Sequence, residues 1–178
     1  MAVPTSYKVQ IGVSMLLAGL AAIAVVLTLL PGRPVVPEAV GLTLFGLVFP
    51  VFGSAMVRCY RAGVQARGPE VLVVLWDTPR WVRVAAGTLT AGVVLCVALG
   101  GGAAGGQPER TAEGYYLNHH GDRQPVSRAT YESALKSGVR GFDAAATFFF
   151  AVSALMAAAA CRAEEEALAE WGWARREV

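Results

Sequence analysis

Long apolar runs alternate with shorter polar segments along this chain. The first run, Ile11 to Leu30, has no charge, and its only polar side chains are Ser14 and Thr28. At about 1.5 Å per residue, a helix of this length spans the roughly 30 Å hydrocarbon core of a bilayer. Three similar runs predict further spans at about 38–57, 83–100 and 142–161. The pattern therefore predicts an all-α membrane protein, a bundle of four transmembrane helices forming a single membrane domain.

The longest polar region, 101–141, predicts a small cap at one end of the bundle. Tyr115–Asn118 and Gln124–Val126 are expected to form a short hairpin around the turn His119–Asp122, whose glycine takes a positive φ. The proline of the second strand restricts that strand to an edge. Ser127 is expected to cap an amphipathic helix, which continues or bends at 138–141 into the fourth span. Its apolar face comprises Tyr131, Ala134, Leu135 and Val139.

The remaining polar segments are interpreted as connectors and a tail. In the loop 58–82, the apolar stretch 70–76 is too short to span and is expected to lie at the interface. Asp77 or Thr78 is predicted to cap the third helix, with Pro79 in its first turn. The glycine-rich stretch 100–106 predicts a flexible hinge, and the tail 162–178 is expected to stay helical to about Trp171.

The distribution of basic residues predicts the orientation of the four spans. Six basic residues lie on the side of the cap: Arg33, Arg110, Arg123, Arg128, Lys136 and Arg140. Nine lie on the other side: Lys8, Arg58, Arg61, Arg67, Arg80, Arg83, Arg162, Arg175 and Arg176. Cytoplasmic segments carry the excess of Lys and Arg. We therefore expect a protein of the cytoplasmic membrane with both termini in the cytoplasm and an extracytoplasmic cap.

Composition supports a membrane protein and narrows its function. The chain is 55% hydrophobic and 16% charged, and its bias to Ala, Gly, Val and Arg is typical of a high-GC bacterial source. A net charge of +2 with no basic cluster argues against a nucleic-acid partner. The three cysteines, Cys59, Cys96 and Cys161, lack the spacing of a redox or metal motif and are expected to be small buried or interfacial residues.

The sequence offers no support for catalysis. It contains no G-x-S-x-G motif, no phosphate loop and no cysteine with a plausible histidine partner. No ionisable residue is expected at mid-depth in a span, which argues against a buried transport carboxylate and against haem ligation by histidine. The CCG motif and loop disulfides of tetraspanins are also missing. We therefore expect neither an enzyme nor a cofactor, and recognise no family.

The leading hypothesis is a non-catalytic protein that acts by protein–protein interaction through its cap. It is expected to be an accessory subunit, a regulator or an immunity-type protein, bound to a membrane or extracytoplasmic partner or to copies of itself. Aromatic residues favour interfaces, although these tyrosines equally suit the small core of the cap. The candidate partner-binding residues are Tyr115, Tyr116, Asn118, His119, His120 and Tyr131.

Two alternative functions stay open. A small transporter or channel-like oligomer would use a second span kinked at Pro50, near Ser54, with Glu38 and Asp143 as ion-binding carboxylates. The competing interpretation pairs these two acids with Arg33 and Arg140 at the helix ends. An extracytoplasmic metal sensor would instead use His119, His120 and Asp122.

Overall fold

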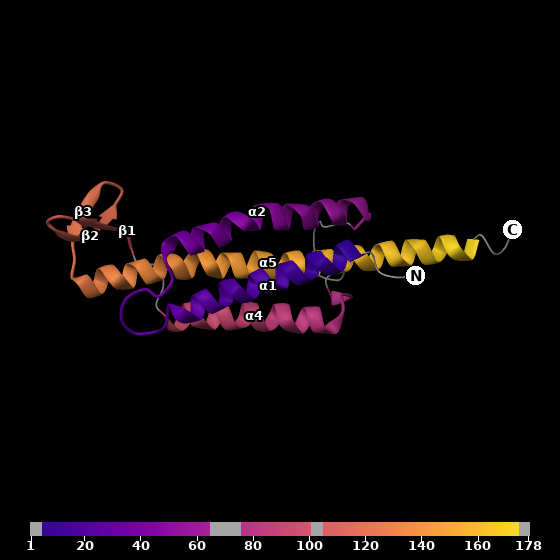
Figure 1. Cartoon of the computed structure of the whole chain (residues 1–178), viewed down its shortest axis with the longest axis horizontal. Helices are drawn as coiled ribbons and strands as arrows, with labels where there is room; N and C mark the ends of the chain where they lie inside the picture. Colours follow the sequence, from indigo (N-terminus) through magenta and orange to yellow (C-terminus); the bar gives the residue numbers. More distant parts are fainter. Residues whose placement is uncertain (1–4, 65–75, 101–104, 175–178) are drawn as a thin grey trace.

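The computed structural model describes residues 5–64, 76–100 and 105–174, with side chains described as far as Glu170. It is mostly helical, at 74%. Four helices are long and apolar enough to cross a membrane, which confirms the predicted set of four apolar helices by length and composition. They are α1 (Thr5–Leu27), α2 (Glu38–Arg61), α4 (Arg80–Leu99) and α5 (Arg128–Ala174), and they lie side by side in Figure 1.

The first two helices overlap the predicted spans without matching their ends. Helix α1 begins before the predicted span 11–30 and ends at Leu27, whereas α2 begins at Glu38, where the second span was predicted to begin, and continues past 57 to Arg61. Helix α4 begins at Arg80, with Pro79 in the N-cap position and no side-chain cap, so the predicted cap at Asp77 or Thr78 is wrong. The helix begins only after the proline, so neither Asp77 nor Thr78 occupies the N-cap position. Pro79 is itself extended, with ψ 135°.

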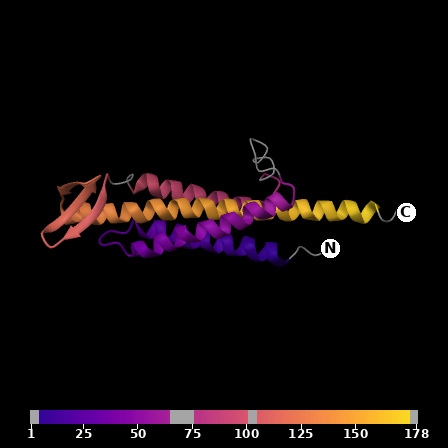
Figure 2. The ribbon, with the colours of Figure 1, turned by 90° about the horizontal axis from the view of Figure 1, so that it is seen from above.

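Helix α5 is the central element and is much longer than the predicted fourth span. It runs for 47 residues, from the sheet through the bundle and beyond the ends of the other helices (Figures 1 and 2). The cap helix and the fourth span are thus one continuous helix. Gly138 and Gly141 do not interrupt it. Helices α1, α2 and α4 each pack on α5.

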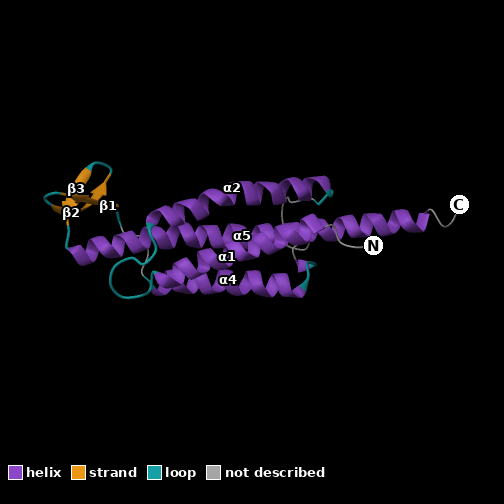
Figure 3. Ribbon diagram, in the orientation of Figure 1, coloured by secondary structure: helices purple, strands orange, loops and turns teal. Residues whose placement is uncertain are grey.

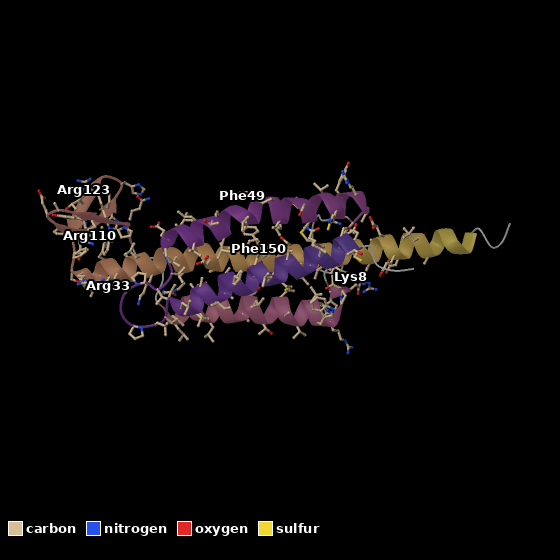
Figure 4. The ribbon with its side chains drawn as sticks, viewed as in Figure 1. Lys8, Arg33, Phe49, Arg110, Arg123 and Phe150 are labelled. Atoms are coloured by element: carbon tan, nitrogen blue, oxygen red, sulfur yellow. The ribbon has the colours of Figure 1, made fainter. Side chains whose placement is uncertain are left out.

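Small residues allow the close packing around α5. Ala157 to Ala160 are all buried, and Ala18 and Ala21 of α1 have no exposed surface. Residues without bulky side chains let helix backbones approach closely, which strengthens the van der Waals packing between them. Phe150 is buried among the helices, whereas Phe49 points outward from α2 (Figure 4). This outward apolar surface is what a helix facing lipid requires.

The cap contains a three-stranded antiparallel sheet rather than a two-stranded hairpin (Figure 3). Its strands, in spatial order, are β1 (Gln107–Thr111), β2 (Gly114–His119) and β3 (Asp122–Pro125). The sequence prediction missed β1, whose proline and charges hide a strand pattern. The predicted turn is correct, since His120 and Gly121 have φ values of 52° and 101°. Pro125 lies on an edge strand, as expected.

Some predictions fall on residues outside the described ranges. The apolar stretch 70–76 is almost wholly within 65–75, and most of the glycine-rich hinge is within 101–104. The tail prediction can be assessed only as far as the helix goes. Helix α5 continues to Ala174, close to the predicted end near Trp171.

Candidate functional site

The strand register divides the predicted partner-binding residues between two faces of the sheet. Directly paired residues share a face, and successive residues alternate. Tyr116 pairs with Glu109 and Pro125, and Asn118 pairs with Gln107 and Arg123, so these residues form an outer face. Tyr115, Leu117 and His119 lie on the opposite, inner face. The predicted set is therefore not a single surface.

The inner face packs against the first turns of α5. The rings of Tyr115 and Tyr131 have centroids 4.9 Å apart, and Leu117 is only 9% exposed. The helix start is fixed by Ser127, whose Oγ accepts a hydrogen bond from the backbone N–H of Thr130, as predicted. Tyr115 and Tyr131 therefore fasten the sheet to α5, which matches the alternative interpretation of these residues as cap core.

A cleft of about 480 Å³ lies where the inner face, α5 and the connector between α1 and α2 meet. Three arginines from three separate segments line it: Arg33, Arg110 and Arg128. Figure 4 labels two of them, Arg33 and Arg110, at the sheet end of the bundle. The Glu132 carboxylate lies 2.9 Å from Nε of Arg128 and 3.7 Å from Nε of Arg33. Glu132 thus forms ion pairs with two of the three arginines in the lining of the cleft.

The third arginine of the cleft is held differently. The Arg110 guanidinium lies over the Tyr115 ring, 5.8 Å from its centroid, which is a cation–π arrangement. From the sequence, Arg110 and Arg128 were counted only among the basic residues that predict the orientation, and Glu132 was not predicted to belong to a site. The spacing of Arg128 and Glu132, four residues apart, was the available signal for their ion pair. Arg110 could not be placed because β1 was not predicted.

The outer face carries an ordered polar network beside an aromatic ring. The Arg123 guanidinium donates to Glu109 at 2.7 Å across β2, and Asn118 Nδ2 donates to the same carboxylate at 3.5 Å. Tyr116 lies between Glu109 and Pro125 in the register and is half-buried. Tyrosine and arginine are two of the residue types enriched among those that dominate protein interfaces.

The metal-ligand candidates are scattered. His119 packs over Gly105 and Gly106, and a Cβ built on Gly106 would lie 2.8 Å from Nε2 of His119. His120 is exposed at the turn, and Asp122 is exposed on β3. Among the described residues, no group of three or more His, Cys, Asp or Glu side chains could hold a metal ion. The described structure therefore offers no observation that favours a metal sensor.

The two carboxylates proposed for transport lie in different environments. Glu38 is exposed and lines the cleft. Asp143 is fully buried against Gly41 of α2, and neither of its carboxylate oxygens has a hydrogen-bond partner. Arg33 was expected to pair with Glu38 or Asp143 at the helix ends. It lies beside Glu132 instead. Asp143 is thus buried by packing, although it lies beside the first turn of α2 and so near the end of that helix.

Arg140 forms hydrogen bonds between α5 and the ends of two other helices, at the sheet end of the bundle. It is 6% exposed, and its Nε donates to Thr28 Oγ1 at 3.0 Å while Nη1 donates to the carbonyl of Gly100. Lys136 Nζ donates to the carbonyl of Leu30 at 2.5 Å. Cations suit the C-terminal ends of helices, where carbonyl groups lack partners. Arg140 therefore joins α5 to the ends of α1 and α4.

Pro50 and Ser54 are exposed on α2, and the helix continues through Pro50. Ser54 Oγ accepts a hydrogen bond from Gln10 Nε2 of α1 at 2.8 Å and donates to the carbonyl of Val51 at 2.8 Å. These bonds give Ser54 a structural role at the contact between α1 and α2. Cys59 and Cys161 are buried at the end of the bundle opposite the sheet, as expected.

Comparison with known proteins adds no assignment. A scan against family models, a search of curated proteins and a search of solved structures each returned no match.

Proposed function

We propose that this chain is a non-catalytic multi-pass membrane protein that acts by binding a partner protein through the outer face of its sheet. The four apolar helices would anchor it in the cytoplasmic membrane, with the sheet outside and both termini inside. The partner would be a membrane or extracytoplasmic protein, or a second copy of the chain. The observation that carries this proposal is the ordered outer face around Tyr116.

Three features of the outer face support a recognition role. The ion pair between Arg123 and Glu109, with 2.7 Å between nitrogen and oxygen, restrains two charged side chains, which would reduce the conformational entropy lost on binding. Tyr116 supplies aromatic contact area beside them. The inner face, by contrast, is already covered by α5 through Tyr115 and Tyr131. Among the described helices α5 makes the main contact with the sheet, and it packs on the inner face.

Both edge strands favour binding through the face rather than through strand addition. Pro108 lies on β1 and Pro125 on β3, and each is on an outer strand of the sheet. Proline has no backbone N–H to donate to an added strand and blunts such edges.

The test is affinity purification of the intact protein in mild detergent, with mass spectrometry and native mass on the same sample. Tyr116→Ala and Arg123→Ala should each lower recovery of the partner by about tenfold, the effect of losing an interface contact worth about 1.4 kcal/mol. Gln124→Ala is the matched control, because Gln124 neighbours Arg123 on β3 but faces the other way in the register.

Equal partner recovery by wild-type protein, Tyr116→Ala and Arg123→Ala would refute the outer face as the binding surface. A monodisperse single chain with no bound protein would refute the proposal altogether. Helicity and elution volume show whether each variant is folded.

A small transporter is the second candidate function, and Asp143 is the observation in its favour. Unpaired ionisable residues inside membrane bundles are costly and often mark ion pathways. Transport predicts that Asp143→Asn abolishes flux, and that cysteines placed along α2 near Pro50 and Ser54 react with water-soluble reagents. Unreactive cysteines along α2 would exclude a water-filled path beside that helix.

A further inference from the structure

A second binding site is built on the inner side of the sheet, away from the proposed partner surface. We propose that the cleft lined by Arg33, Arg110 and Arg128 binds the phosphate of an anionic phospholipid headgroup. The inference rests on the membrane placement proposed above, but not on the existence of a protein partner.

The charge of the cleft favours an anion. Three arginines and two glutamates, Glu38 and Glu132, line it. Glu132 contacts its two arginines through their Nε atoms. Each guanidinium also carries two Nη groups, which suit the paired oxygens of a phosphate. Arg110, placed over the Tyr115 ring, adds a third cation from the sheet.

Helix α2 contributes to the same preference. It begins at Glu38, beside the cleft, and Pro37 in its N-cap position offers no side-chain hydrogen bond. The first N–H groups of a helix need acceptors, and the helix dipole favours negative charge there. The N-terminus of α2 thus adds to the attraction that the arginines exert on an anion, and would not form an anion site without them.

The shape of the lining favours a lipid over free phosphate. Val36, Leu135 and Val139 give the cleft an apolar part beside its charged part. Arg33 and Val36 belong to the connector just after the apolar helix α1, where headgroups would lie if α1 spans the bilayer. A lipid offers phosphate to the arginines and the start of its acyl chains to the apolar residues. Free phosphate would contact only the arginines and leave the apolar residues without a partner.

The experiment uses the purified full chain and pure lipids, so that no partner protein is present. Flotation with phosphatidylcholine liposomes first establishes membrane insertion on its own. Native mass spectrometry then measures retention of phosphatidylglycerol against phosphatidylcholine, whose ammonium group cancels the phosphate charge. Wild-type protein should retain phosphatidylglycerol preferentially, and Arg110→Gln should weaken that retention about fivefold, the effect expected for one arginine at a membrane surface.

Two further variants test the charge argument from opposite sides. Glu38→Gln removes a negative charge from the cleft and should strengthen retention of phosphatidylglycerol. Arg123→Gln is the matched control, since it makes the same charge change on the outer face and should leave retention unchanged. Arg110 is an exposed residue of β1. Measurements of helicity and elution volume show whether the Arg110→Gln protein is folded.

Three outcomes would overturn the inference. The first is equal retention of the two lipids by wild-type protein. The second is a loss with Arg123→Gln as large as the loss with Arg110→Gln. The third is displacement of phosphatidylglycerol by inorganic phosphate at equal concentration, which would assign the cleft to a soluble anion. Failure of flotation would instead remove the membrane placement and, with it, the proposed function.

Discussion

Asp143 of α5 packs directly on Gly41 of α2, with space at Gly41 for a methyl group but for little more. A Cβ built on Gly41 would lie 3.4 Å from Oδ2 and 3.5 Å from Oδ1 of Asp143. Both residues are buried. A small residue and an unpaired acid thus form one packing unit between two of the apolar helices.

This packing predicts a graded response to substitutions at Gly41. Gly41→Ala places its methyl group at the near limit of ordinary contact and should change the free energy of unfolding little. Gly41→Val adds two further methyl groups against the carboxylate and should destabilise the protein by about 1–3 kcal/mol through overpacking. Thermal unfolding in detergent measures both, with Gly46→Val as control, because a Cβ at Gly46 meets nothing within 4 Å. Equal effects of Gly41→Val and Gly46→Val would contradict the contact.

Asp143 itself should limit stability. A buried polar group without a hydrogen-bond partner is unfavourable, and more so when it is ionised. Asp143→Asn keeps the shape and removes the charge, so it should raise the free energy of unfolding by about 1 kcal/mol at neutral pH. A destabilised Asp143→Asn protein would mean that the carboxylate makes a stabilising interaction. A stabilised protein that has lost flux would support the transport alternative.

Arg140 is expected to be the most sensitive residue at the sheet end of the bundle. Arg140→Ala removes hydrogen bonds from a charged donor to Thr28 and Gly100, and should destabilise by about 2–4 kcal/mol. Gly100→Ala should act in the same direction, because a Cβ at that position would collide with the guanidinium. Arg162→Ala is the control, since Arg162 is exposed and pairs only on the surface with Glu166, at 3.6 Å. Unfolding curves that coincide for Arg140→Ala and Arg162→Ala would show that Arg140 does not stabilise the junction of α5 with α1 and α4.

The contact between the Tyr115 and Tyr131 rings predicts that the sheet can loosen without the helical bundle. Tyr131→Ala removes the ring that packs on Tyr115, and should speed hydrogen exchange in residues 107–125 about tenfold, since an aromatic pair is worth about 0.5–1.5 kcal/mol beyond its buried area. Exchange in α1 and α2 should stay unchanged. Tyr116→Ala, on the outer face, serves as the control. Unchanged exchange in Tyr131→Ala would show that other contacts hold the sheet.

The sequence was informative where one physical signal dominates, and uninformative where several distant segments must meet. Apolar runs long enough to cross a bilayer predicted the four helices, and the glycine in the turn after His120 predicted positive φ. The burial of Asp143 was not predicted from the sequence. Its burial depends on Gly41, a residue about a hundred positions away, which no local pattern links to it.

The candidate surfaces were predicted only in part, for the same reason. Tyr115 and Tyr116 are adjacent, and alternation alone implies opposite faces, but which face packs on α5 depends on the position of Tyr131. The cleft joins the α1–α2 connector, β1 and α5, and β1 was not predicted. Charged residues such as Arg33 and Arg110 are individually unremarkable in sequence. Only the fold brings them to one cleft.

The orientation of the helices leads to the last prediction. In Figure 1 both described ends of the chain lie at the end of the bundle opposite the sheet. The excess of basic residues at that end predicts that it is cytoplasmic. A cysteine introduced by His120→Cys at the exposed turn should therefore react with a membrane-impermeant maleimide in intact cells. One introduced by Glu170→Cys on α5 should react only after permeabilisation.

The native cysteines set the background of this labelling. Cys59 and Cys161 are buried, whereas Cys96 is partly exposed, so both variants are made together with Cys96→Ser. Protein carrying Cys96→Ser alone should stay unlabelled before permeabilisation. Labelling of Glu170→Cys but not His120→Cys in intact cells would invert the orientation. It would place the sheet, with the outer face around Tyr116, inside the cell, and the partner would then have to be cytoplasmic.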